Sequence, residues 1–289
     1  MKFAFSANAF RNYSLAYTIA ALADAGYEGI EIMADMPHAY PPSLTGADIR
    51  DIRLLLDRRH MEISNINAFM LHAEGDTYHP SWIEREPRLR DRRVAYTLDC
   101  IDLAAQLGAP SISIEPGGPL QGMSFDEGIE LFKEGLRTVQ DSAQQKGVRV
   151  LIEPEPGLLI ENSTQFLSLI DDLDTEVFGL NFDIGHFFCV GESCPVLIFT
   201  LSRYIDHFHL EDIAASKEHV RLMPGKGAID LPEVLHAIKN IDYSGFITVE
   251  LYTYDDRPTA AAQEALYYLE RIADIRTTPP FPSPAVELQ

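Results

Sequence analysis

The chain has 289 residues, of which 46% are hydrophobic, so it can bury a large core, and its formal net charge at pH 7 is −21. So acidic a chain is not expected to bind nucleic acid or an anionic membrane surface, because phosphates are held mainly by clustered Lys and Arg. No apolar run approaches the ~20 residues that a membrane helix needs, and the first residues turn polar too early for a secretory signal, so we expect a cytoplasmic protein without a membrane partner.

Strand-like and helix-like segments alternate along the chain. The strands are short apolar or β-branched runs, predicted at residues 2–5, 29–33, 61–66, 111–114, 148–152, 177–182, 205–210 and 246–250. The helices carry apolar residues at three- and four-residue spacing and are predicted at residues 14–26, 47–60, 87–107, 125–145, 164–172, 195–201, 231–238 and 259–275. A run of arginines from Arg85 to Arg93 opens the third helix, and we interpret it as a solvated helix face.

This strict alternation predicts an α/β fold in which helices cover a parallel sheet. Eight strand-helix units in a chain of this length predict a closed (β/α)8 TIM barrel, which typically takes about 250 residues. The sequence lacks the glycine-rich phosphate-binding motifs of open dinucleotide-binding sheets. We therefore expect a single barrel domain over residues 1–276. A proline-rich tail over residues 277–289 should lie extended on a surface or on a neighbouring subunit.

Polar residues terminate the last four predicted strands. The functional site of such a barrel lies at the carboxyl ends of its strands, and Glu153, Asp183, His209 and Glu250 occupy those positions. Because these strands are neighbours around the wall, we expect the four side chains to converge. Three carboxylates and one imidazole suit Mn²⁺, Mg²⁺ or Co²⁺ and tolerate Zn²⁺, whereas three carboxylates without a cation would repel one another.

Two alternatives require no metal. The inward charges could pair with one another, or with Arg221 or Lys226, in a polar barrel top. Asp183 could instead cap the segment that follows it, with His186 serving as a hydrogen-bonded loop histidine. In either case Gly185 lets the backbone turn sharply between Asp183 and His186.

Five motifs connect these positions to a known family. They are AGYEGIE at 25–31, NFDIGH at 181–186, HFHLED at 207–212, PGKGAID at 224–230 and YSGFITVE at 243–250. With them the chain resembles the xylose isomerase-like barrel superfamily, in the branch of sugar phosphate isomerases and epimerases that includes ketose 3-epimerases, inosose dehydratases and dehydroshikimate dehydratases. The resemblance covers essentially the whole chain. The motifs are specific for the superfamily but do not select a substrate.

The resemblance implies that Glu153, Asp183, His209 and Glu250 bind one divalent metal ion. In the ketose 3-epimerases, the positions that match Glu153 and Glu250 are also the acid and base of the reaction. The resemblance further implies a homo-oligomer, since relatives on this fold are often dimers or tetramers.

Other positions are expected to contact substrate. The resemblance gives this role to His186 and to Arg221, although Arg221 lies farther beyond the metal histidine than the epimerase pattern places its arginine. Glu155 is expected to replace a second acid that the epimerases carry later in the chain. Asn67, at the end of the third predicted strand, is a further candidate for substrate contact.

The expected substrate is therefore a sugar, a sugar phosphate or a polyol-derived ketone. A metal-stabilised enediolate, with two glutamates moving protons, would serve an epimerase or an aldose-ketose isomerase. Expulsion of a β-hydroxyl would make the same site a dehydratase of the inosose or dehydroshikimate kind. A non-catalytic metabolite-binding protein that retains the metal site is the remaining alternative. The acidic charge disfavours phosphodiester hydrolysis as in the AP endonuclease relatives on this fold.

Overall fold

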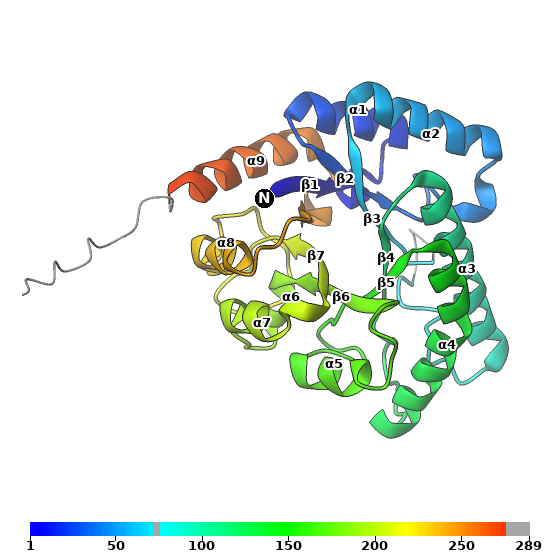
Figure 1. Cartoon of the computed structure of the whole chain (residues 1–289). Helices are drawn as coiled ribbons and strands as arrows, with labels where there is room; N and C mark the ends of the chain where they lie inside the picture. The colour runs from blue at the N-terminus through cyan, green and yellow to red at the C-terminus, as the bar shows by residue number, and fades with distance from the viewer. Residues whose placement is uncertain (72–75, 276–289) are drawn as a thin grey trace, which may run out of the picture.

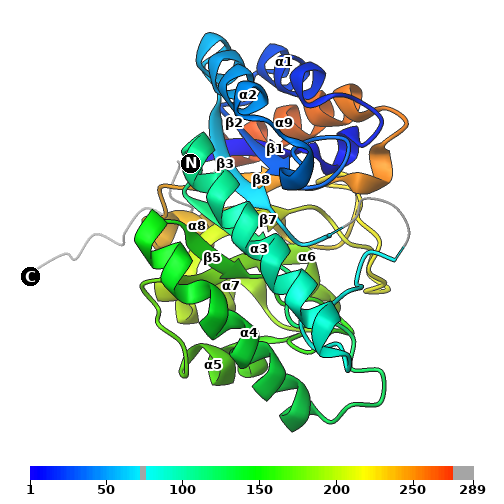
Figure 2. The ribbon, with the colours of Figure 1, turned by 90° about the vertical axis from the view of Figure 1, so that its right-hand side faces the viewer.

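The computed structural model describes residues 1–71 and 76–275. Within these residues, eight parallel strands form a closed barrel in which β1 pairs with β8, two strands that Figure 2 labels. This confirms the predicted (β/α)8 architecture, whose ring of strands can be followed in Figure 1. The strands follow one another around the barrel in chain order, and all their pairings are parallel. They are β1 (Lys2–Ser6), β2 (Gly29–Met33), β3 (Glu62–Asn67), β4 (Ser111–Ile114), β5 (Arg149–Ile152), β6 (Phe178–Asp183), β7 (Ile205–Leu210) and β8 (Phe246–Val249).

The long helices lie outside the ring of strands (Figures 1 and 2). The α-helices are α1 (Leu15–Ala25), α2 (Gly46–Arg59), α3 (Pro87–Leu107), α4 (Phe125–Lys146), α5 (Ser163–Ile170), α6 (Ile184–Cys189), α7 (Cys194–Thr200), α8 (Leu231–Asn240) and α9 (Pro258–Ile275). Four 3-10 helices accompany them: η1 (Ala7–Phe10), η2 (Pro41–Ser43), η3 (Ser202–Tyr204) and η4 (Tyr252–Tyr254).

Local sequence sets the helix ends. Ser14 caps α1 by accepting a hydrogen bond from a backbone amide of the first turn, and Ser124 caps α4 in the same way. Thr45 and Asp48 form a reciprocal capping box at the start of α2. At the other end of α1, Gly26 adopts the left-handed conformation with φ of 100°, which glycine adopts without steric penalty. Each predicted helix and strand is present, with ends that differ by at most two residues.

The short helix α6 was not predicted, because the sequence analysis expected a sharp turn at Gly185. Asp183 is instead the N-cap of α6, and its Oδ1 accepts a hydrogen bond of 2.8 Å from the backbone amide of His186. Gly185 lies within this helix, where a Cβ atom would collide with the carboxylate of Glu211. The glycine is therefore required for close packing, and the capping role considered for Asp183 is confirmed.

The interpretation of the arginine run as a solvated helix face was wrong for Arg93. This side chain is fully buried: its Nε donates to the carbonyl oxygen of Pro80 at 2.8 Å, its Nη1 donates to that of Phe69 at 2.8 Å, and its Nη2 lies 3.1 Å from Glu115 Oε2. Helical periodicity places Arg93 on the same inner face of α3 as the buried Cys100, seven positions later. The side chain thereby joins α3 to the end of β4 and to the segment that follows β3.

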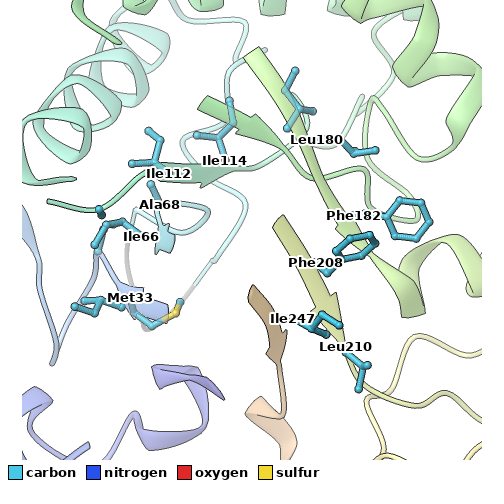
Figure 3. Close-up of a cluster of buried hydrophobic side chains, with 14 of the residues drawn as sticks. Met33, Ile66, Ala68, Ile112, Ile114, Leu180, Phe182, Phe208, Leu210 and Ile247 are labelled. Atoms are coloured by element: carbon cyan, nitrogen blue, oxygen red, sulfur yellow. The ribbon is translucent and has the colours of Figure 1, made fainter. Parts of the chain in front are cut away.

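The apolar core lies between the strands and the helices. Figure 3 shows part of it, with Phe182 of β6 beside Phe208 of β7 at a ring-centroid distance of 5.4 Å. Ile112 and Ile114 of β4 contribute to the same layer and are fully buried. Because successive strand side chains point to opposite faces, this apolar outer face leaves the intervening residues directed into the barrel.

Within residues 1–71 and 76–275, no helix combines the length and the apolar character that crossing a bilayer requires. The tail predicted at residues 277–289 lies outside the described residues.

Candidate functional site

The interior of the barrel is polar and is joined by hydrogen bonds between strands. His207 Nδ1 lies 2.9 Å from Asn181 Oδ1, and His207 Nε2 lies 2.8 Å from Thr248 Oγ1. Burial lowers the pKa of His207 to about 3, so this imidazole is neutral near pH 7. The polar interior fixes the side chains beneath the carboxyl ends of the strands.

Four ligand-type side chains converge at the carboxyl ends of β5 to β8. Glu153, Asp183, His209 and Glu250 each offer one ligand atom, these atoms lie within 4.8 Å of one another, and all four residues are buried. His209 Nδ1 lies 3.1 Å from Glu153 Oε1, 3.6 Å from Glu250 Oε2 and 3.8 Å from Asp183 Oδ2. The structure therefore brings together the four residues that the sequence analysis selected as metal ligands. We call them the ligand cluster.

A carboxylate on the opposite side of the barrel holds the imidazole of the ligand cluster. His209 Nε2 lies 2.7 Å from Glu31 Oε2, which also accepts a hydrogen bond of 2.9 Å from Asn65 Nδ2. Burial alone would raise the pKa of Glu31, but His209 outweighs it and lowers the pKa to about 2. A carboxylate behind a histidine is the usual support of a metal-binding imidazole, because it keeps a proton on one nitrogen and leaves the other free to bind.

The ligand cluster suits a divalent cation. Burial would lower the pKa of His209, but the carboxylates of Glu31, Glu153 and Glu250 raise it well above its usual value. The local potential thus strongly favours positive charge. Glu250 Oε2 is buried and contacts Arg221 Nη2, but it makes no well-formed hydrogen bond within the described residues, so it retains a lone pair for a ligand. Oxygen donors with one nitrogen suit Mn²⁺, Mg²⁺ or Co²⁺ and accept Zn²⁺.

Arg221 reaches the ligand cluster from the segment between β7 and α8. Its Nη2 lies 3.0 Å from Asp183 Oδ2 and 3.2 Å from His186 Nε2, and it also contacts the carboxylate of Glu250. Its guanidinium carbon lies 4.7 Å from the ring centroid of Tyr252, within the range of a cation-π contact. The pairing with Arg221 that was considered as an alternative to metal is therefore present, at the edge of the same ligand cluster.

Asp212 holds the segment that carries Arg221. Its Oδ1 accepts backbone hydrogen bonds from Ile213 at 2.9 Å and Ile229 at 3.1 Å. Its Oδ2 accepts from Gly225 at 3.0 Å and Gly227 at 2.8 Å. One buried carboxylate thus satisfies backbone amides along the whole segment and fixes its path beside β7.

Two predicted substrate contacts, Glu155 and His186, lie next to the ligand cluster. Glu155 Oε1 accepts a hydrogen bond of 2.9 Å from Tyr78 and lies 3.8 Å from His219 Nδ1. Burial raises the pKa of Glu155 to about 8. His186 Nδ1 lies 2.9 Å from the carbonyl oxygen of Pro154, which can only accept, so the proton is on Nδ1. Burial lowers the pKa of His186, which leaves the ring neutral with a lone pair on Nε2.

Two further trios have ligand atoms close enough to hold an ion: Glu31 with His207 and His209, and Glu155 with His186 and His219. The imidazoles of the first trio are held by the hydrogen bonds of the barrel interior. In the second, Arg221 Nη1 lies 3.3 Å from His219 Nε2, and Nη2 lies 3.2 Å from His186 Nε2. This trio offers one carboxylate, whereas the ligand cluster offers three, so the ligand cluster is the better candidate for a divalent cation.

A cavity of about 410 Å³ opens above the ligand cluster, a volume within the range of small-molecule sites. Predicted site residues on its wall are Asn67, Glu153, Glu155, His186, Arg221 and Glu250. Asn67 donates to Glu31 Oε1 at 3.3 Å, and its Oδ1 accepts from the backbone amide of Phe69 at 3.1 Å. Asp183 and His209 are fully buried and do not line the cavity.

The sequence analysis did not identify several residues of the cavity wall, namely Asp35, His38, Tyr78, His219 and Tyr252. They lie beyond the ends of β2, β3, β7 and β8, where periodicity gives no guide. Their position shortly after a barrel strand is the one signal that could have identified them.

Comparison with known proteins supports an enzyme on this fold. An inosose dehydratase of Clostridium perfringens is 24% identical over 262 residues, which cover 80% of this chain and 80% of that protein. A 2-oxo-tetronate isomerase of Pectobacterium atrosepticum is 26% identical over 235 residues, which cover 80% of this chain and 83% of that protein. The chain is accordingly an enzyme of the isomerase or lyase type.

Solved structures agree with the fold. The crystal structure of the IolI protein with a binding zinc atom matches 94% of this chain and 98% of that chain with a TM-score of 0.79, at 21% identity. The family model of the xylose isomerase-like TIM barrel matches residues 19–272. The chain therefore belongs to the xylose isomerase-like TIM barrel family.

Proposed function

We propose that this enzyme is a divalent-metal-dependent isomerase or epimerase that acts on a sugar, a sugar phosphate or a polyol-derived ketone. The observation that carries the proposal is the ligand cluster beneath a cavity. Glu153 and Glu250 both line the cavity and both lie close to His209 Nδ1, at 3.1 Å and 3.6 Å. The zinc atom in the structure of IolI and the isomerase among the relatives support the proposal.

The ligand cluster would hold the cation, and His186, Arg221, Glu155 and Asn67 would contact the substrate. When bound, a divalent cation would polarise the carbonyl group of an α-hydroxyketone and stabilise the negative charge that develops on it. His186 Nε2 lies 3.2 Å from Arg221 Nη2, so a substrate hydroxyl that takes the place of Nη2 can donate to His186. The guanidinium of Arg221 can then donate to a substrate oxygen. These contacts would orient the carbon next to the carbonyl toward the two glutamates.

Proton transfer would be the work of Glu153 and Glu250. One carboxylate takes the proton from the carbon next to the carbonyl, and the other returns a proton to the opposite face of that carbon, which inverts its configuration. Return of the proton to the neighbouring carbon would interconvert a ketose and an aldose. Which of these outcomes applies depends on how the substrate lies between the two groups.

The test combines metal analysis with proton exchange. The purified protein should contain Mn, Mg, Co or Zn and should catalyse deuterium uptake from D₂O next to the carbonyl of a ketose, an inosose or a hydroxy-keto acid. Glu250→Gln should lower this exchange at least ~100-fold, whereas Glu264→Gln, the same change at a side chain of α9 that is 42% exposed, should not affect it. Bound metal without exchange would instead support a metabolite-binding protein, and absence of metal would contradict the ligand cluster.

A dehydratase is the second candidate, and the inosose dehydratase relatives favour it. One of the same glutamates could remove the proton while the other protonates the β-hydroxyl, which leaves as water. Mass spectrometry of the product separates the two candidates, because an isomer has the mass of the substrate and a dehydration product has lost one water.

A further inference from the structure

The cavity has a second polar wall, which begins beside Glu250 at the end of β1 and continues beyond the end of β2. Asp35 and His38 follow β2, and Asn8 lies in η1 after β1; all three line the cavity and are buried. In the closed barrel β2 lies four strands from β6, which ends in Asp183. A ligand that fills the cavity therefore contacts the ligand cluster with one part and these three residues with another. We call them the distal wall.

Asp35 is the central residue of the distal wall. Its side chain is 4% exposed, and it makes no hydrogen bond to any side chain in the described part of the protein. A buried carboxylate with no side-chain partner is costly, and burial, which outweighs a hydrogen bond from its own backbone, raises the pKa of Asp35 to about 7. A carboxyl group that retains its proton to near-neutral pH can both donate and accept a hydrogen bond, as a substrate hydroxyl can.

His38 and Asn8 also have unused hydrogen-bonding capacity. His38 Nε2 lies 3.2 Å from the carbonyl oxygen of Phe10, so Nε2 carries the proton and Nδ1 is an acceptor, which has no partner among the described residues. Asn8 Nδ2 donates to Glu250 Oε1 at 2.7 Å, and its Oδ1 is unpartnered among those same residues. Asn8 thus connects the distal wall to the ligand cluster.

The distal wall offers little to an anion. The arginines on the described cavity wall are both engaged: Arg11 Nε lies 2.7 Å from Asp255 Oδ2, and Arg221 Nη2 lies 3.0 Å from Asp183 Oδ2. A phosphate next to Asp35 would place negative charge beside a carboxyl group that ionises near pH 7, and the described cavity wall offers no arginine or lysine without a carboxylate partner.

We propose that Asp35, His38 and Asn8 form a subsite for the hydroxyl groups of the substrate that lie away from the reacting carbonyl, and that the substrate is an unphosphorylated polyol ketone. This assignment rests on the proposed function and selects among its substrate classes. Asp35 exchanges hydrogen bonds with a neutral hydroxyl, and the acceptor atoms of His38 and Asn8 complete the contact after small side-chain adjustments.

Calorimetric binding to the Mn²⁺-loaded full chain tests the proposal with matched probes, namely D-fructose and D-tagatose against their 6-phosphates. We expect each free ketose to bind at least ~10-fold more tightly than its phosphate ester. Equal or tighter binding of the phosphate esters would overturn the proposal, and so would failure of every free ketose to bind.

Substitutions at Asp35 locate the effect. Asp35→Leu should weaken D-fructose binding about tenfold and abolish the preference for D-fructose over 6-deoxy-D-fructose. Asp35→Asn keeps a hydrogen-bonding group but cannot carry a charge. It should therefore reduce the difference in binding affinity between each ketose and its phosphate ester. Asp57→Asn, on the exposed face of α2, is the matched control. Wild-type binding by Asp35→Leu would contradict the subsite, provided that its metal content shows a folded site.

These outcomes separate the subsite from the proposed function. If free ketoses bind but no proton exchange occurs, the proposed function is contradicted, whereas the subsite is still supported. If proton exchange occurs but the phosphate esters bind more tightly than the free ketoses, the proposed function is supported and the subsite is contradicted. Where exchange is measurable, Asp35→Leu should raise KM more than it lowers the exchange rate at saturation, because Asp35 binds the substrate away from the reacting carbon.

Discussion

The two halves of the barrel mouth use the same architecture with different chemistry. The charged residues of the ligand cluster stand at the ends of β5 to β8, whereas β1 and β2 are followed by Asn8, Asp35 and His38. None of these three belongs to a group of potential metal ligands among the described residues. Charge is thus concentrated on one side and hydrogen-bonding capacity on the other. The comparison suggests that the first half selects the substrate and the second half transforms it, with Glu31 joining the two through His209.

The largest effect on stability is expected at the buried ion pair between Arg93 and Glu115, which lies in the first half of the barrel. Arg93→Met should lower the free energy of unfolding by ~3–5 kcal/mol, because it leaves Glu115 buried without its ion-pair partner. Urea denaturation measures this loss. Arg92→Met, the same change at the exposed neighbouring position, should shift the free energy of unfolding by less than ~0.5 kcal/mol. Similar losses for the two variants would contradict the role given to the buried ion pair.

The charge state of Asp35 should appear in the pH dependence of stability. Its pKa is about 7 in the folded protein and about 4 in an unfolded chain. Between pH 4 and pH 7, Asp35 retains a proton in the folded protein that it has lost in the unfolded chain. Its contribution therefore lowers the free energy of unfolding as the pH rises, and no further loss occurs once the pH is above 7. Between pH 4 and pH 8, the free energy of unfolding of Asp35→Asn should rise relative to that of the wild type by on the order of 3 kcal/mol. Parallel stability curves for the two proteins would contradict the shifted pKa.

Glu31 tests the connection between the halves. Glu31→Gln should weaken metal binding ~10–100-fold, because the amide supports the imidazole of His209 less well than a carboxylate. Competition with a fluorescent chelator gives the affinity. Glu62→Gln, at an exposed position of β3, provides the control. Unchanged affinity in Glu31→Gln would show that the two halves act independently.

The smallest effect is expected at Asp212. Asp212→Asn replaces one carboxylate oxygen with an amide nitrogen. This nitrogen cannot accept hydrogen bonds from the backbone amides of the segment that carries Arg221, for example the amide of Gly227. We expect a loss of ~1–2 kcal/mol in unfolding free energy, with faster amide hydrogen exchange confined to residues 213–229. Exchange that accelerates uniformly over the protein would indicate a global effect instead.

The regular part of the molecule could be predicted from sequence because it depends on periodic burial. Parallel strands of a barrel end at one edge, so residues at consecutive strand ends had to converge, and Glu153, Asp183, His209 and Glu250 do converge. Helical periodicity alone would have placed Arg93 on the buried face of α3, because it lies seven residues before the buried Cys100. The charge of the side chain led instead to the prediction that it is exposed.

The loops could not be predicted in the same way. Asp35 and His219 reach the cavity from irregular segments, whose paths depend on tertiary contacts such as the backbone hydrogen bonds to Asp212. Gly185 was misassigned to a turn because sequence alone does not show that Glu211 packs against it.

The hydrogen bond between Asn8 and Glu250 joins residues 242 positions apart, which has a consequence for biosynthesis. A nascent chain that ends before β8 lacks both the strand that closes the barrel and the last member of the ligand cluster. Contacts of such long sequence separation form late. Tight metal binding should therefore be acquired only after β8 and Glu250 have left the ribosome, so loading with metal would mark a closed barrel.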